Sequence, residues 1–128
     1  MQMLSFREFE AGPDPFGRKF QVMLKWLQTA ISIRHADAVD VKFVLTGENG
    51  ARIERTVSFP HAALLQVSAE TGRKMDDAWC GRLARLHLES MIRNGEDMEK
   101  DLVTVGSADL RKLAEELAAL EKSGAKAA

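Results

Sequence analysis

A chain of 128 residues, of which 45% are hydrophobic and 29% are charged, has the size and composition of one ordinary globular domain. Its formal net charge of −1 and its lack of tyrosine give no electrostatic signature of nucleic-acid binding, so nucleic acid is not an expected partner. No apolar run reaches the roughly eighteen residues of a membrane span, so no membrane association is expected.

The cellular compartment is indicated by two features of the sequence. Cys80 is the only cysteine and cannot form an internal disulfide. The N-terminal residues lack the basic start and the apolar block of a secretory signal. Both features predict a cytoplasmic protein.

The longest helical pattern runs from Asp14 to His35. Asp14 followed by Pro15 is typical of an N-cap and a proline in the first helical turn. Apolar residues then recur at steps of three and four, with a polar set at the same steps on the opposite side. The apolar set is Phe16, Phe20, Met23, Leu24, Leu27 and Ile31, and the polar set is Arg18, Gln21, Lys25, Gln28, Ser32 and His35. This periodicity predicts one long helix.

A strand is the alternative for residues 18–27. The apolar residues Phe20, Val22, Leu24 and Trp26 alternate with polar ones, as they would in a half-buried strand. On this interpretation residues 12–17 form a loop between two strands, which suits Gly17 better than a helical turn does. We favour the helix because its polar stripe is unbroken, whereas the alternation fails at Met23 and Leu27.

The sequence pattern of residues 39–59 predicts a β-hairpin. Apolar residues alternate from Val39 to Leu45, and the turn at residues 47–50 contains Asn-Gly, which tolerates the positive φ that hairpin turns need. The returning strand, residues 52–59, has its inward face interrupted by Arg55, so an edge position is expected for it. Residues 4–9 are a candidate for a further edge strand.

Three helices are predicted after the hairpin, at residues 61–71, 78–93 and 108–122, each with a capping residue or a terminating glycine at one of its ends. Residues 95–106 form an acidic connector between the last two. The predicted fold is therefore α+β: an antiparallel sheet built on a central β-hairpin (39–59), preceded by one long helix and followed by three helices packed on one face. We expect a single domain, 1–122, and a disordered tail, 123–128.

A polar cluster lies where the predicted long helix gives way to the first hairpin strand. It consists of Arg34, His35, Asp37 and Asp40, and His61 at the start of a helix is a possible fifth member. An imidazole with two carboxylates suits a divalent cation or proton transfer. We favour the plainer interpretation, in which the two aspartates flank a turn and pair with Arg34 or His35. No recognised cofactor motif is present, and no metal or other cofactor is predicted.

Two of the later helices carry further patterns. Cys80 and His87 share one helix face and are expected to be buried, with an inert thiol and a satisfied imidazole. The opposite face, with Arg82, Arg85, Glu89 and Arg93, predicts a solvated row with ion pairs at four-residue spacing, and nucleic-acid binding there is the less favoured alternative.

The last predicted helix has a leucine stripe with coiled-coil spacing, and packing on the protein's own core is favoured over a dimer seam. The stripe consists of Leu110, Leu113, Leu117 and Leu120.

The function predicted from these observations is a non-catalytic cytoplasmic interaction module of unknown specificity, which self-associates, possibly through the C-terminal helix. The alternative is a small enzyme or metal-binding protein with a site at His35, Asp37, Asp40 and possibly His61. The geometry of that cluster distinguishes the two, because a catalytic or metal site needs these side chains to converge.

Overall fold

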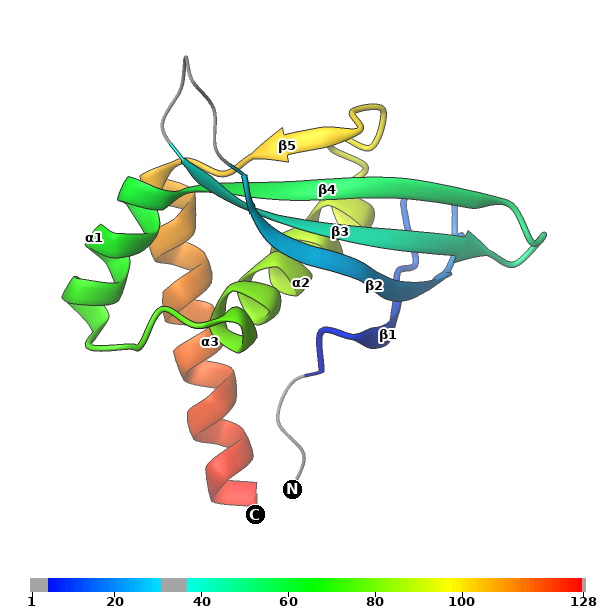
Figure 1. The fold of residues 1–128 in the computed structure, drawn as a ribbon. Helices are drawn as coiled ribbons and strands as arrows, with labels where there is room; N and C mark the ends of the chain where they lie inside the picture. The colour runs from blue at the N-terminus through cyan, green and yellow to red at the C-terminus, as the bar shows by residue number, and fades with distance from the viewer. Residues whose placement is uncertain (1–4, 31–36, 128) are drawn as a thin grey trace.

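The computed structural model describes residues 5–30 and 37–127. It consists of a five-stranded mixed sheet with helices on one side of it (Figure 1). The elements within these residues are β1 (Glu8–Ala11), β2 (Phe20–Ala30), β3 (Ala38–Gly47), β4 (Arg52–Pro60), α1 (His61–Thr71), α2 (Asp77–Asn94), β5 (Leu102–Thr104) and α3 (Ser107–Ala127). The strands lie in the sheet in chain order. Neighbours from β1 to β4 are antiparallel, and β5 is parallel to β4.

The three helices lie on one side of the sheet (Figure 1). α2 lies against β1, β3 and β4, and α3 packs on α1 and α2. The strand residues that face these helices are buried, and they alternate with residues on what we call the outer face, on which none of the described helices lies.

The long helix predicted over residues 14–35 is wrong, because residues 20–30 form the strand β2 and no long helix precedes the hairpin among the described residues. Residues 31–35 of that prediction lie outside the described residues. The alternative interpretation, two strands joined by a loop at residues 12–17, agrees with the structure. β2 pairs with β1 on one side and with β3 on the other, so it is an inner strand and not a helix.

A β-bulge explains why the alternation in β2 failed at Leu27. Partner positions run from Phe20↔Gly47 to Leu24↔Phe43, then shift by one residue so that Trp26 lies opposite Lys42. The extra residue, Lys25, reverses the phase of the strand, so Leu24 before it and Leu27 after it both pack against the core. Gln21, Lys25 and Gln28, three of the polar residues that formed the predicted helical stripe, lie instead on the outer face of β2.

The hairpin of β3 and β4 confirms the prediction for residues 39–59. Gly50 has φ of 83°, Gly50 N donates to Gly47 O at 2.9 Å, and the Asn49 side chain accepts from Ala51 N at 3.0 Å. The edge position predicted for the return strand is wrong, because β5 pairs with β4 along Thr56–Ser58. β5 comes from the segment that was predicted to be only an acidic connector.

The helices α1, α2 and α3 were predicted to within a few residues, except that α3 continues to Ala127. Asp76 caps α2 by accepting a hydrogen bond from Trp79 N at 2.8 Å, and Gly95 ends it with φ of 69°. The disordered tail predicted from residue 123 is therefore helical up to residue 127, whereas residue 128 lies outside the description.

The segment before β1 is held against α2 by a close contact between Phe6 and Gly81. Phe6 is 6% exposed, and a Cβ atom at position 81 would overlap its ring. Arg85 reinforces the contact, because its guanidinium donates to Ser5 O and lies 4.4 Å from the ring centroid of Phe9. The glycine in α2 is therefore required by packing and not by backbone conformation.

The substitution Gly81→Ala tests this contact. In an exposed helix interior, replacing glycine with alanine stabilises the helix by about 1 kcal/mol. At position 81, however, the added methyl group must displace the ring of Phe6. We expect the free energy of unfolding, measured by urea denaturation, to fall by roughly 1–2 kcal/mol. In a Phe6→Ala background the same substitution should become stabilising, and a stabilising effect in the unmodified chain would contradict the contact.

Candidate functional site

The polar cluster predicted from the sequence is only partly described. Arg34 and His35 lie outside the described residues. Asp37 is exposed, and its carbonyl oxygen accepts from His61 N at 2.8 Å, which ties the start of β3 to the start of α1. Residues 5–30 and 37–127 contain no group of three or more His, Cys, Asp and Glu residues placed to hold a metal ion.

Asp40 has an unusual environment compared with Asp37 and His61, the other described members of that cluster. It lies on the outer face, opposite Gln28 of β2 and Ser58 of β4. Ser58 is 6% exposed. The Oδ1 atom of Asp40 is buried and accepts no hydrogen bond from the described residues. A buried carboxylate oxygen without a partner loses solvation energy without compensation, so this atom is a candidate contact for a ligand.

The outer face combines apolar and charged side chains around the bulge. Glu54 accepts from Lys25 Nζ at 2.7 Å and lies 3.0 Å from Lys42 Nζ, and the same Lys42 nitrogen lies 5.5 Å from the ring centroid of Trp26. Met23 and Leu102 are 54% and 49% exposed. The residues of this face, from the strand alternation and pairing, are Glu8, Glu10, Gln21, Met23, Lys25, Trp26, Gln28, Asp40, Lys42, Val44, Thr46, Arg52, Glu54, Thr56, Ser58, Leu102 and Thr104.

The buried thiol predicted on α2 is confirmed. Cys80 is 3% exposed, and burial raises its pKa to about 12, with the charges of Asp77 and Asp76 acting in the same direction. The thiol is therefore protonated at neutral pH and is a poor nucleophile. His87 is half-buried, burial lowers its pKa, and its Nε2 atom has no hydrogen-bond partner among the described residues, so the predicted satisfied imidazole is wrong.

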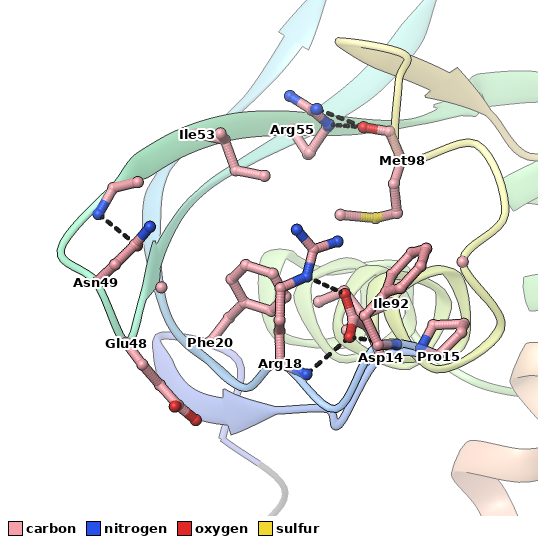
Figure 2. Close-up of a pocket in the computed structure, with 14 residues that line it drawn as sticks. Asp14, Pro15, Arg18, Phe20, Glu48, Asn49, Ile53, Arg55, Ile92 and Met98 are labelled. Atoms are coloured by element: carbon pink, nitrogen blue, oxygen red, sulfur yellow. Dashed lines mark hydrogen bonds and ion pairs between the residues drawn. The ribbon is translucent and has the colours of Figure 1, made fainter.

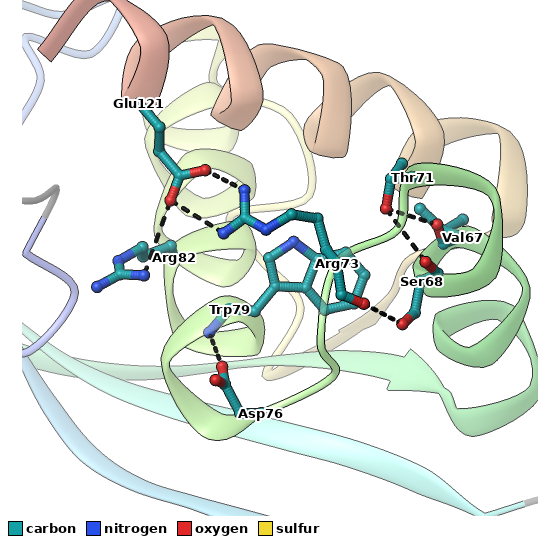
Figure 3. Close-up of polar contacts among 8 residues, drawn as sticks. All are labelled: Val67, Ser68, Thr71, Arg73, Asp76, Trp79, Arg82 and Glu121. Carbon is teal, nitrogen blue, oxygen red and sulfur yellow. Dashed lines mark hydrogen bonds and ion pairs between the residues drawn. The ribbon is translucent and has the colours of Figure 1, made fainter. Parts of the chain in front are cut away.

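Arg82 and Arg85 of α2 bind other parts of the protein instead of lying in a solvated row, whereas Arg93 is exposed as predicted. Arg85 pairs with Glu89 at 3.0 Å as predicted, but its side chain is only 17% exposed. Arg82 and Arg73 both contact Glu121 near the end of α3 (Figure 3). These ion pairs fix α3 against α2 and against the α1–α2 loop, which leaves Arg82 and Arg85 poorly placed to bind a nucleic acid.

Most of the leucine stripe of α3 is buried within the protein. Leu110, Leu113 and Leu117 are 0%, 7% and 0% exposed and belong to the core, whereas Leu120 is 44% exposed. Packing on the protein's own core, the favoured interpretation of the stripe, is thus confirmed for the first three leucines.

A cavity of about 550 Å³ is a feature that the sequence did not indicate (Figure 2). It lies at the hairpin end of the sheet, on the side of the helices, between the β1–β2 loop, the β3–β4 hairpin and the end of α2. Arg18 and Arg55 are its basic residues. The walls come from segments far apart in the chain, and Asp14, Phe16 and Arg18 had been assigned to a helix, so no sequence pattern connected them.

No protein-family model matches this chain, and no curated protein or solved structure shows significant similarity to it. Among the residues that the structure describes, no helix combines the length and the apolarity that crossing a membrane requires.

The Glu54 carboxylate provides a test of the outer-face geometry. Hydrogen bonds from Lys25, which has the larger effect, and from Lys42 lower the pKa of Glu54 from 4.5 to about 2. A lowered pKa in the folded state stabilises the protein above pH 4.5, and this contribution is lost as the pH falls towards 2. We expect carbon-detected NMR titration to give that low value. Lys42→Met should raise it towards 4.5, whereas Lys112→Met on α3 should leave it unchanged.

Proposed function

We propose that the protein is a non-catalytic cytoplasmic interaction module that self-associates through the outer face of its sheet. The supporting observation is that this face, on which none of the described helices lies, presents Trp26, Met23 and Leu102 among charged residues. Apolar side chains with a polar surround are typical of protein interfaces.

A second copy of the chain is the occupant that the charges favour. The outer face carries Lys25, Lys42 and Arg52 together with carboxylates on β1, β3 and β4. A surface with both signs can match its own copy across a two-fold axis, whereas a surface of one sign would repel its copy. Two sheets packed face to face are a common architecture, and their strands cross at about 30°.

The size of the face indicates a small interface. Strands about 4.8 Å apart and roughly seven residues long give a surface of about 20 by 23 Å. Two such faces would bury on the order of 1,000 Å² in total, which is at the lower end of specific interfaces. We therefore expect a dimer with micromolar affinity.

The C-terminal helix α3, through which self-association was expected from the sequence, exposes less of its leucine stripe than that prediction requires. Three of its four stripe leucines are buried in the protomer, and Leu120 is the stripe residue that remains exposed. The sheet therefore provides the broader apolar and charged surface.

Charge insertion on three surfaces tests the proposed interface. Met23→Glu, Leu120→Glu and Leu65→Glu each replace an exposed apolar residue, on the outer face, α3 and α1 respectively. By sedimentation velocity from about 10 µM to about 1 mM, the unmodified chain should dimerise and Met23→Glu should weaken the dimer roughly tenfold or more. The other two variants should behave like the unmodified chain.

The outcomes separate the possible interfaces. A dimer that only Leu120→Glu disrupts would place the contact on α3 and contradict the outer face. A chain that stays monomeric throughout this range would contradict self-association.

The second candidate is a small enzyme or metal-binding protein with a site at His35, Asp37 and Asp40, to which His61 is a candidate addition. The observation that favours it is that Oδ1 of Asp40 is buried and has no hydrogen-bond partner within residues 5–30 and 37–127. A divalent cation is one ligand that would compensate such an atom.

Calorimetric titration with Zn²⁺ and Mn²⁺ tests the second candidate. If Asp40 contributes a ligand, binding should be saturable at micromolar metal, and Asp40→Asn should weaken it by about tenfold or more. The matched variant Glu115→Gln removes an exposed carboxylate from α3 and should have no effect. Absence of saturable binding, or equal binding by Asp40→Asn, would exclude this site.

A further inference from the structure

The cavity at the hairpin end of the sheet has the size and the wall chemistry of a small-molecule site. Its volume of about 550 Å³ lies in the range of roughly 300–1,000 Å³ that is usual for ligand pockets. Its walls are mainly apolar and include Phe16, Phe20, Ile53, Ile92 and Met98. Figure 2 shows the side chains of Ile53 and Met98 directed into the same space.

Arg18 places a fixed cationic group in this space. Its Nε atom donates to Asp14 Oδ2 at 2.7 Å, and its guanidinium points into the cavity (Figure 2). The Arg18 side chain is 65% exposed, and its terminal nitrogens have no hydrogen-bond acceptor among the described residues. An arginine held through Nε can still donate one N–H from each of its two terminal nitrogens to a carboxylate in bidentate geometry.

Asp14 orients Arg18 and has little remaining capacity for other partners. Its side chain is 7% exposed, and it accepts backbone hydrogen bonds from Phe16 N at 2.9 Å and Arg18 N at 2.8 Å in addition to the guanidinium. Burial acts to raise the pKa of Asp14, but the hydrogen bonds from Arg18 and Phe16 outweigh it and lower that pKa. The carboxylate is thus ionised and fully engaged, and it holds the guanidinium at one position.

Arg55 adds positive charge to the wall of the cavity. Its side chain is 14% exposed and donates to the carbonyl oxygens of Met98 and Glu54. Carbonyl groups satisfy its N–H groups without neutralising the charge. The Asp101 carboxylate lies 3.6 Å away, but its side chain is 98% exposed, so it offsets the charge of Arg55 only in part. Glu48, the other acidic residue of the lining, points away from the cavity (Figure 2). The interior therefore favours an anion.

We infer that this cavity binds a small amphiphilic carboxylate, with the carboxylate on the terminal nitrogens of Arg18 and the apolar body against Ile53, Ile92 and Met98. The apolar walls select a hydrocarbon chain or ring over a sugar or a nucleotide, because they provide few hydrogen-bonding groups. The site lies on the helix side of the sheet, so it is separate from the outer face proposed for self-association.

Calorimetric titration with octanoate tests this inference, with 1-octanol as the probe that lacks the charge. Octanoate should bind saturably with one molecule per chain, and 1-octanol should bind at least about tenfold more weakly, because a charge-assisted bidentate contact is lost. Arg18→Gln should weaken octanoate binding by about the same factor. Lys19→Gln removes the same charge from the neighbouring residue, which does not line the cavity, and should change nothing.

A second readout separates a loss of the site from a loss of the fold. Octanoate should shift backbone amide signals at residues 14–18, 47–55 and 92–98, and the Trp26 indole signal on the outer face should stay in place. Phe16→Ala, at an 82% exposed position in the lining, should weaken binding several-fold without lowering the melting temperature. Equal affinity for octanoate and 1-octanol, no effect of Arg18→Gln, or no saturable binding at millimolar octanoate would each overturn the inference.

Discussion

The phase reversal at Lys25 in β2 is the constraint on which both faces of the sheet depend. β2 is an inner strand, paired with β1 and β3. The bulge turns Leu24 and Leu27 to the same side, so the helix-facing surface stays apolar on both sides of Lys25. It also places Lys25 and Trp26, which are consecutive in sequence, beside Glu54 and Lys42 on the other surface. Without the extra residue, one half of the strand would expose its apolar side chains.

Strand β2 also contributes to both the cavity and the outer face, the two regions to which a function is assigned above. Its first residue, Phe20, lines the cavity, and the loop before it carries Asp14 and Arg18, so the cavity depends on where the strand begins. Further along β2, Gln28 lies opposite Asp40 on the outer face. The cavity and the outer face therefore share one strand but lie on opposite sides of the sheet, which allows the two proposed activities to be independent.

Local sequence signals were sufficient for much of the fold. The β3–β4 hairpin follows from its clean alternation and its Asn-Gly turn, and the three helices follow from capping residues and terminating glycines. β2 was misassigned because its residues satisfy both a helical and an alternating pattern, and a bulge breaks the alternation at the point that should have distinguished them. β5 spans three residues and is stabilised mainly by pairing with β4, so its own sequence carries little signal. The contacts of Gly81 with Phe6 and of Arg18 with the cavity join distant segments, and a single sequence does not reveal them.

The most direct test of this account is the register of β2 against β3 on either side of Lys25. In a backbone NOE spectrum, cross-strand contacts should connect Val22 with Leu45 before the bulge and Leu27 with Val41 after it, which is a shift of one residue. Both β2 residues should also give the short sequential contacts of extended chain. A continuous register across residues 20–30, or the i to i+3 contacts of a helix in that stretch, would contradict the phase reversal and with it the arrangement of both faces.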